Sequence, residues 1–154
     1  MARKSAGILF YRVHDQTPEF LLVHPGGPYW AKKDAGAWSI PKGEFTDSEE
    51  PLQAALREVD EELGVSVSGD FIPLTPLKQK SGKAIYAWAL EYEIDPTAIR
   101  SNTVELNWPP GSGSKNQFPE VDKAAWFTID EARQKINPGQ FGFIKELTEK
   151  IRAR

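Results

Sequence analysis

The sequence of 154 residues contains no cysteine, two histidines and no long apolar run. Without cysteine the chain has neither disulfides nor thiolate metal centres, and two isolated histidines do not make a zinc site. The N-terminal segment from Met1 to Tyr11 is too short, and too often interrupted by polar residues, for a signal peptide or a membrane span. We therefore expect a cytoplasmic protein without a membrane partner.

A basic charge balance is also missing, because the net charge is −3. This balance argues against strong nonspecific binding of nucleic acid, but it allows a phosphorylated small molecule as the partner. Metal ions and a local group of lysines would then supply the positive field around such a substrate. The length is typical of one domain, so we expect a single domain over residues 1–154.

Apolar periodicity and turn residues predict strands that alternate with a few helices. Strands are expected at residues 5–12 and 19–23, joined by a turn at 15–18, and at 71–79, 84–94 and 124–128. Helices are expected at residues 50–63, 129–136 and 140–151, with a short helical turn at 95–100. Residues 24–36 and 108–118 are rich in glycine and proline and are predicted as loops. This order indicates an α/β fold with a mixed sheet between helical layers.

The helix expected at residues 50–63 has an apolar stripe on one side. The stripe consists of Leu52, Ala55, Leu56, Val59 and Leu63. Pro51 suits the first turn, and Ser48 or Asp47 is a candidate for the N-cap. Gly64 suits the left-handed position that follows a helix.

A second side of the same helix is acidic. Glu58, Glu61 and Glu62 stand at i, i+3 and i+4, so their carboxylates share one face, whereas Asp60 points away from it. Like charges at this spacing repel one another, and hard divalent cations remove the repulsion by taking carboxylate oxygens as ligands. The alternative is a solvated charged face, but such a face normally mixes charges of both signs.

The acidic helix belongs to a longer pattern with fixed spacing. It reads Gly43-x5-Glu49-x7-Arg57-Glu58-Val59-x-Glu61-Glu62-x-Gly64-Val65. This segment resembles the Nudix box, the signature of the Nudix hydrolase family, without any departure from its pattern. The resemblance implies the Nudix α/β/α sandwich and the hydrolysis of a nucleoside diphosphate linked to another group, X, by attack of water on phosphorus. It also implies Mg²⁺ or Mn²⁺ as the cofactor.

The resemblance also assigns roles to the residues of the box. Glu58, Glu61 and Glu62 would be the metal ligands and catalytic residues, joined by a backbone carbonyl near Lys42 or Gly43. Structural roles fall to an ion pair between Arg57 and Glu49, which fixes the loop against the helix, and to backbone turns at Gly43 and Gly64.

A second stretch after the box is similar to part of some Nudix branches. Pro119-Glu120-Val121-Asp122, with Trp126 shortly after, is similar to their Pro-Glu-Phe-Asp…Trp run. In those relatives the glutamate faces the metals, so the resemblance makes Glu120 a metal ligand and the best candidate for the general base. The alternative is a surface glutamate beside a proline turn.

Substrate recognition is assigned to a set of cations. The candidates for phosphate contacts are Lys42, Lys32, Lys33, Lys80 and Arg3. The run from Pro41 to Glu44 is similar to Nudix branches that cleave diadenosine polyphosphates, diphosphoinositol polyphosphates or RNA 5′ ends. It favours a dinucleoside polyphosphate or a nucleoside triphosphate as the substrate. A Nudix-fold nucleotide-binding or regulatory module without catalysis stays open as the alternative from another class.

The tryptophans and histidines outside these motifs are expected to have structural roles. Trp30, Trp38 and Trp108 could stack on a nucleobase, but such residues more often anchor loops. His14 and His24 are expected to be turn residues.

Overall fold

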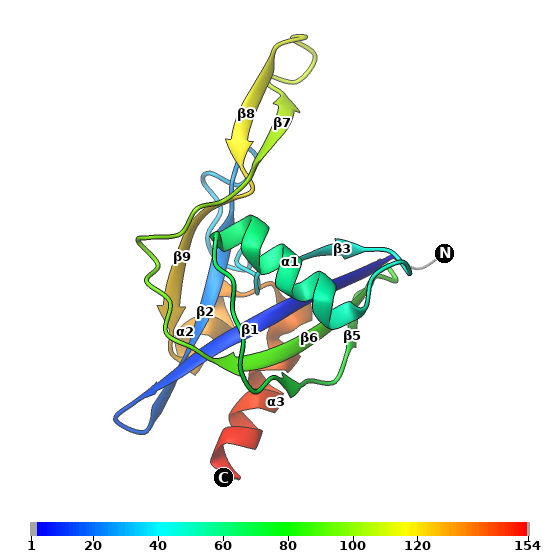
Figure 1. The fold of residues 1–154 in the computed structure, drawn as a ribbon. Coiled ribbons are helices and arrows are strands. Elements are labelled where there is room, and N and C mark those ends of the chain that lie inside the picture. Colours follow the sequence, from blue (N-terminus) through cyan, green and yellow to red (C-terminus); the bar gives the residue numbers. More distant parts are fainter. Residues whose placement is uncertain (1–2, 154) are drawn as a thin grey trace.

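The computed structural model describes residues 3–153, in which a mixed sheet lies between helices (Figure 1). The strands of the main sheet are β1 (Lys4–His14), β2 (Thr17–Pro25), β3 (Lys42–Phe45), β4 (Ile72–Pro73), β5 (Leu77–Lys78), β6 (Ala84–Glu91) and β9 (Val121–Phe127). A separate two-stranded hairpin consists of β7 (Thr103–Asn107) and β8 (Lys115–Pro119). The helices are α1 (Pro51–Leu63), α2 (Ile129–Lys135), η1 (Pro138–Gln140) and α3 (Phe141–Arg152).

Strand β1 is the centre of the sheet. It pairs in parallel with β6 along one edge, and on its other edge with β3 in its first half and β2 in its second half, both antiparallel. Its residues from Ser5 to Tyr11 are all buried, because both faces of the sheet are covered. Strand β2 continues the sheet by pairing with β9.

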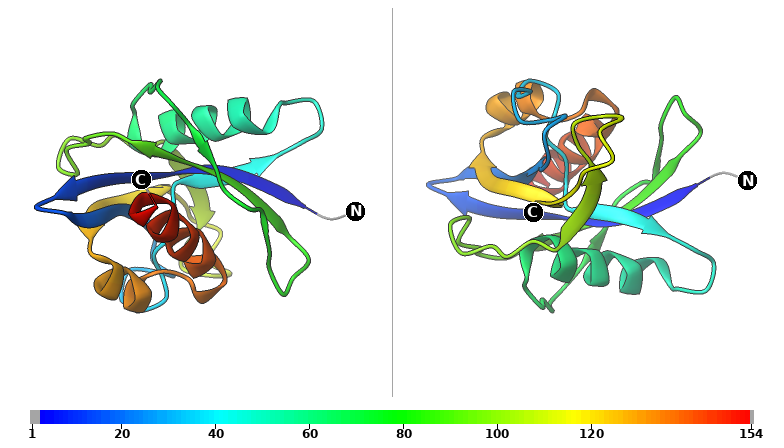
Figure 2. Two further views of the ribbon diagram at one scale, coloured as in Figure 1. Left: turned by 90° about the horizontal axis from the view of Figure 1, so that it is seen from below. Right: turned by 90° about the horizontal axis from the view of Figure 1, so that it is seen from above.

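Each face of the sheet has its own apolar core. Helix α1 covers one face and helices α2 and α3 cover the other (Figure 2). Side chains of β1 alternate between the two cores: Ile8 and Phe10 face α1, whereas Leu9 and Tyr11 face the opposite side. The predicted α/β fold with a mixed sheet between helices is confirmed.

Helix α1 begins and ends close to the predicted residues. Gly64 ends it with φ 72° and a hydrogen bond from its N–H to the carbonyl of Asp60, as its position in the sequence indicates. The predicted cap is wrong, because Glu50 occupies the N-cap position, and its side chain makes no capping hydrogen bond. Asp47 instead pairs with Lys4, and the Ser48 hydroxyl bonds to that of Thr46.

The segments around the hairpin depart most from the sequence prediction. The glycine- and proline-rich loop expected at 108–118 is shorter, because residues from Lys115 onward form β8. Its partner β7 has no counterpart in the predicted elements. The strand predicted at 71–79 is split into β4 and β5, with Leu74 buried between them. The helical turn expected at 95–100 is only a turn at Asp95 to Ala98.

The helices of the described part of the chain are short and amphipathic. None of those within residues 3–153 has both the length and the apolar character needed to cross a membrane.

Candidate active site

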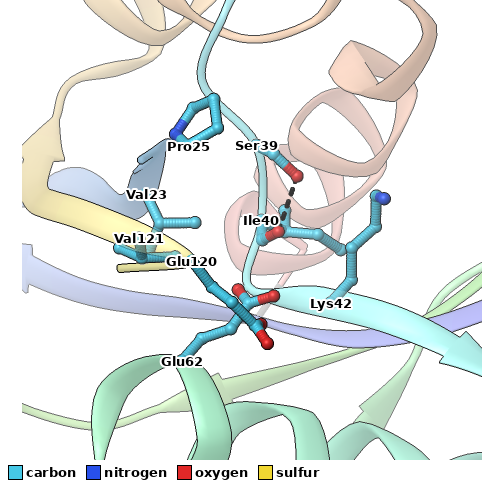
Figure 3. Close-up of a pocket in the computed structure, with 8 residues that line it drawn as sticks. All are labelled: Val23, Pro25, Ser39, Ile40, Lys42, Glu62, Glu120 and Val121. Carbon is cyan, nitrogen blue, oxygen red and sulfur yellow. Dashed lines mark hydrogen bonds between the residues drawn. The ribbon is translucent and has the colours of Figure 1, made fainter. Parts of the chain in front are cut away.

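Three glutamates from two distant segments meet beside the C-terminal half of α1. Glu58 and Glu62 stand one helical turn apart on α1, and Glu120 stands between β8 and β9. One carboxylate oxygen from each lies within 4.8 Å of the other two. Figure 3 shows the side chains of Glu62 and Glu120 directed toward one another. The fold therefore brings Glu120 to the acidic face of the helix.

The cluster is unusual because acidic side chains are buried together. Glu58 is 7% exposed and Glu62 is 8% exposed. Burial raises the pKa of the Glu62 carboxyl to about 8, and the charges of Glu58 and Glu120 act in the same direction. Burial and the charge of Glu61 raise the pKa of Glu58 and that of Glu120. A cation placed among these carboxylates would remove the repulsion that raises their pKa values.

Gly43 makes room for the cluster. A Cβ added to Gly43 would lie 2.0 Å from the carboxyl carbon of Glu58 and about as close to both of its oxygens. No side chain fits at this position while Glu58 keeps its conformation. The glycine at the start of the box therefore allows the carboxylate of Glu58 to lie directly against β3.

Arg57 holds the acidic helix against the preceding loop. Its Nε and Nη2 donate to the two carboxylate oxygens of Glu49 at 2.8 and 2.9 Å, and this is the ion pair expected from the sequence. Its Nη1 donates to Glu58 at 3.0 Å and to Glu61 at 3.2 Å. Arg57 thus contacts Glu58, which belongs to the cluster with Glu62 and Glu120, and also Glu61, which is not one of those three carboxylates.

A cavity of about 180 Å³ opens beside the cluster. Its walls come from β2, the segment before β3, the first residue of β3, α1, and the start of β9 with the residue before it. The lining residues are Val23, Pro25, Ser39, Ile40, Lys42, Glu62, Glu120 and Val121 (Figure 3). Two glutamates, one lysine and one serine therefore share the cavity with four apolar residues.

Lys42 is the candidate cation that lines this cavity. Burial lowers its pKa, and the nearby charge of Lys83 lowers it further, whereas Glu62, Glu44 and Glu58 oppose the change. Lys83 was not a candidate from the sequence, although it directly precedes β6, the parallel neighbour of β1. Its Nζ lies 3.3 Å from a carboxylate oxygen of Glu44. In the sequence it lies between the strands expected at 71–79 and 84–94, and only the parallel pairing of β1 and β6 places it near Lys42.

The other candidate cations do not line the cavity. Arg3 lies 3.8 Å from Glu44 and is exposed. Lys80 is exposed in the turn between β5 and β6. Lys32 and Lys33 are exposed in the loop between β2 and β3, where the ammonium of Lys33 lies 5.0 Å from the ring centre of Trp30. Lys42 therefore lines the cavity, whereas the other four predicted cations do not.

Gln140 is a positioning residue that the sequence did not indicate. It is 2% exposed, and its Oε1 accepts hydrogen bonds from the backbone N–H of Ile40 at 3.1 Å and the Ser39 hydroxyl at 3.2 Å. Both of these residues line the cavity. A glutamine before a helix gives no signal in the sequence, because its role depends on a segment about one hundred residues away.

His24 is buried and is not the turn residue expected from the sequence. Its Nδ1 lies 2.8 Å from a carboxylate oxygen of Asp122, and its Nε2 lies 2.6 Å from the carbonyl oxygen of Lys33. Its ring packs edge to face on Trp38. His24 therefore ties the loop between β2 and β3 to β9, close to Glu120.

Comparison with known proteins places this geometry in a family. The family model for the NUDIX domain matches residues 1–147. The chain is similar to the bis(5′-nucleosyl)-tetraphosphatase [asymmetrical] of Rattus norvegicus, with 29% identity over 65% of this chain and 72% of that protein. It is also similar to the RNA pyrophosphohydrolase of Aeromonas hydrophila, with 30% identity over 68% of this chain and 63% of that protein.

The fold has solved relatives as well. The crystal structure of a C. elegans Ap4A hydrolase binary complex covers 99% of this chain and 100% of its own, with a TM-score of 0.65 and 20% identity. At 20% identity this likeness shows a shared fold and nothing more. The family match carries the functional class, and the expectation of an enzyme of the pyrophosphohydrolase type is confirmed. The chain belongs to the Nudix hydrolase family.

Proposed function

We propose that this enzyme hydrolyses a diphosphate linkage in a nucleoside diphosphate linked to X, with Mg²⁺ or Mn²⁺ as the cofactor. The favoured substrate class is a dinucleoside polyphosphate. The observation that carries the proposal is the buried cluster of Glu58, Glu62 and Glu120 in and beside a cavity that also contains Lys42.

The donor set fits a hard divalent cation. Carboxylate oxygens are the ligands that Mg²⁺ and Mn²⁺ prefer, and three of them lie within 4.8 Å of one another. Burial makes the metal-free cluster unfavourable in its charged form. Glu58, Glu62 and Glu120 would hold the ion, and Glu61 would join them when it leaves Arg57. The bound ion would supply charge neutralisation at the phosphate oxygens and a more acidic water.

The side chains of the site have separate tasks in the reaction. Glu120 accepts the proton of the attacking water, whose oxygen forms the new bond to phosphorus. The bond between phosphorus and the bridging oxygen breaks, and the leaving phosphate departs with the electron pair of that bond. Lys42 neutralises phosphate oxygens inside the cavity. Lys83 adds positive charge near Lys42, and Arg57 keeps Glu58 oriented.

Support for a dinucleoside polyphosphate comes from the relatives. The rat relative is a bis(5′-nucleosyl)-tetraphosphatase, and the similar solved structure is that of a C. elegans Ap4A hydrolase. The run from Pro41 to Glu44 favours the same class, because Lys42 replaces a glycine found in other branches at the mouth of the site. The 5′ end of a triphosphorylated RNA is the second candidate, since the bacterial relative is an RNA pyrophosphohydrolase.

A substrate panel tests the proposal. Purified protein is incubated with Mg²⁺ or Mn²⁺ in isotopically labelled water, and the products are separated by mass. We expect cleavage of diadenosine tetraphosphate to ATP and AMP at a higher kcat/KM than for dGTP or for triphosphorylated RNA, with the label in one product. Preferential release of pyrophosphate from RNA would support the second candidate instead. Failure to cleave any diphosphate would contradict the proposal.

Two lysine variants test whether Lys83 contributes to phosphate binding. Lys83→Ala should raise KM for diadenosine tetraphosphate, because it removes positive charge near Lys42. The matched control is Lys80→Ala, which removes an exposed lysine from the turn before the same strand. Equal effects of the two substitutions would indicate a general effect of charge and not a specific contact.

A further inference from the structure

Two of the large apolar side chains that stay exposed in this chain stand next to one another. Tyr29 is 56% exposed and Trp30 is 41% exposed, both in the loop between β2 and β3. Exposed aromatic rings that stand together often mark a binding surface, since burial of such rings is otherwise favourable. A single exposed residue such as Val13 needs no such explanation.

The loop does not stand alone, because Tyr29 contacts the projecting hairpin. The rings of Tyr29 and Trp108 meet edge to face, with centroids 5.0 Å apart. Trp108 directly follows β7, and its backbone is held by hydrogen bonds with Ser114 and Asn116. The hairpin of β7 and β8 projects from the body of the molecule (Figure 1). Two separate segments thus present aromatic rings to one region.

This aromatic surface is joined to the candidate active site through the start of the loop. Pro25 lines the cavity, and the N–H of Gly26 donates to the carbonyl oxygen of Glu120 at 2.9 Å. A Cβ on Gly26 would lie 2.0 Å from the carbonyl oxygen of Pro119, so the loop packs tightly on the segment that carries Glu120. Tyr29 is four residues beyond Pro25, so their Cα atoms are at most about 14 Å apart.

The cavity is too small to hold a whole nucleotide, so a bound nucleotide needs a second contact surface outside it. At about 180 Å³ the cavity is smaller than the usual pocket for a small molecule. It has room for phosphate groups beside the carboxylates, so a nucleoside attached to them lies outside. A nucleoside and its phosphate chain can span the distance from the cavity to Tyr29.

The charge of the loop also suits a nucleotide. The ammonium of Lys33 lies over the ring of Trp30, at 5.0 Å from its centre, and Lys32 stands beside it. A cation at this position can approach the phosphates of a ligand whose base lies on the neighbouring rings. An aromatic surface that carries positive charge therefore fits an anionic ligand with a flat apolar end.

We propose that Tyr29, Trp30 and Trp108 form a stacking surface for the nucleobase of the substrate. The inference rests on the proposed function, since it assumes that the phosphate chain lies in the cavity beside Glu62 and Glu120. It assigns the substrate to nucleotides and sets the enzyme apart from those that act on base-free polyphosphates. The rings contact the flat face of a base and not its hydrogen-bonding edge, so adenine and guanine should bind with similar affinity.

Binding of matched ligands with and without a base tests this inference. The affinities of ATP and of inorganic tripolyphosphate are measured by calorimetry in the presence of Mg²⁺, for the wild type and for Tyr29→Leu and Trp30→Leu. We expect each substitution to weaken ATP binding by roughly 5- to 150-fold, the range that stacking of one base gives. Tripolyphosphate binding should stay within about twofold of the wild type, because its contacts lie in the cavity.

The control is Val13→Ser, which changes an exposed apolar residue at the end of β1. It should leave both affinities unchanged. An equal loss for ATP and tripolyphosphate in the Tyr29 and Trp30 variants, or no loss for either, would overturn the inference. A wild type that sediments as a dimer, together with monomeric variants that bind ATP normally, would show that the surface holds a second copy of the chain.

The two proposals can fail separately. The affinities do not require turnover, so a protein that cleaves no diphosphate would still report whether a base binds to the aromatic surface. Conversely, a Tyr29→Leu variant with unchanged ATP affinity and normal hydrolysis would leave the proposed function intact and remove only the stacking surface.

Discussion

The carboxylate of Glu58 occupies the space that a side chain on Gly43 would need. A Cβ at Gly43 would lie 2.1 and 2.2 Å from the two carboxylate oxygens. The nearest atoms belong to the end of a flexible side chain, so a larger residue can be accommodated if Glu58 moves. The position of Glu58 in the cluster therefore depends on the first glycine of the box.

The substitution Gly43→Ala follows from this contact. We expect the fold to persist, with a loss of stability of about 1 kcal/mol, while Glu58 is displaced from Glu62 and Glu120. Calorimetric titration with Mn²⁺ should show weaker binding, and turnover should fall with it. Gly139→Ala is the control, because a Cβ there has its nearest neighbour at 3.3 Å, on Asn137, and meets none of the glutamates. Unchanged Mn²⁺ affinity in Gly43→Ala would contradict the assignment of Glu58 as a ligand.

Glu61 and Glu62 of the box should differ in their effects. Glu62→Gln removes a buried member of the cluster, and we expect turnover to fall by about 100-fold or more at saturating Mg²⁺. Glu61→Gln should cost less, because Glu61 is not one of the three carboxylates that lie within 4.8 Å of one another. Asp60→Asn, on the exposed side of the same helix, is the matched control and should retain full activity. A Glu62→Gln variant with the wild-type rate would rule out a metal at this position.

The pair of Arg57 and Glu49 should contribute modestly to stability. Both side chains are partly exposed, at 38% and 31%, so solvent screens the charges. We expect a coupling free energy of about 0.5–1 kcal/mol between Arg57→Gln and Glu49→Gln in urea unfolding. Arg57→Gln should also lower activity, because it releases Glu58. Additive effects of the two substitutions on the free energy of unfolding would show that the ion pair is not stabilising.

The pKa values of the cluster predict a pH-dependent effect of metal. Folding raises the pKa of Glu62 from 4.5 to about 8, so the folded metal-free protein binds protons more tightly than the unfolded chain. The stabilising contribution is complete below pH 4.5 and is lost as the pH rises toward 8. The loss is on the order of a few kcal/mol at most.

Thermal unfolding with and without Mn²⁺ measures this effect. Because metal binds the charged carboxylates, the rise in Tm caused by Mn²⁺ should be larger at about pH 8 than at about pH 6. Glu62→Gln serves as the control, since it removes the titrating group and should reduce the pH dependence. An equal rise in Tm at both pH values would contradict the prediction.

The box was readable from the sequence because its chemistry is local. Three glutamates within five residues share a helix face by helical geometry alone, and Gly64 ends the helix for a backbone reason that needs no partner. The prediction of α1 and of its acidic face therefore required no tertiary information. What the spacing could not show is that Arg57 binds both Glu58 and Glu61, and that Glu58 and Glu62 meet Glu120 from a distant segment.

The parts that sequence reasoning missed depend on distant contacts. Strand β7 has a weak pattern, because its hairpin projects from the body and most of its residues are exposed. Lys83 reaches the site only through the pairing of β1 with β6. Gln140, at the end of η1, reaches it only through its hydrogen bonds with Ser39 and Ile40. Local periodicity carries no information on such contacts.

The two histidines give a further test of these distant contacts, because one is exposed at the end of β1 and the other is buried. His24→Leu removes the hydrogen bonds to Asp122 and to the Lys33 carbonyl and leaves both acceptors without this partner. We expect a loss of about 1–3 kcal/mol in the free energy of unfolding, measured by urea denaturation. His14→Leu should change the stability by less than about 0.5 kcal/mol. Because His24 fixes the loop that carries Lys33, hydrogen exchange in that loop should also increase in His24→Leu alone. Equal stability of the two variants would show that the buried histidine does not hold the loop to β9.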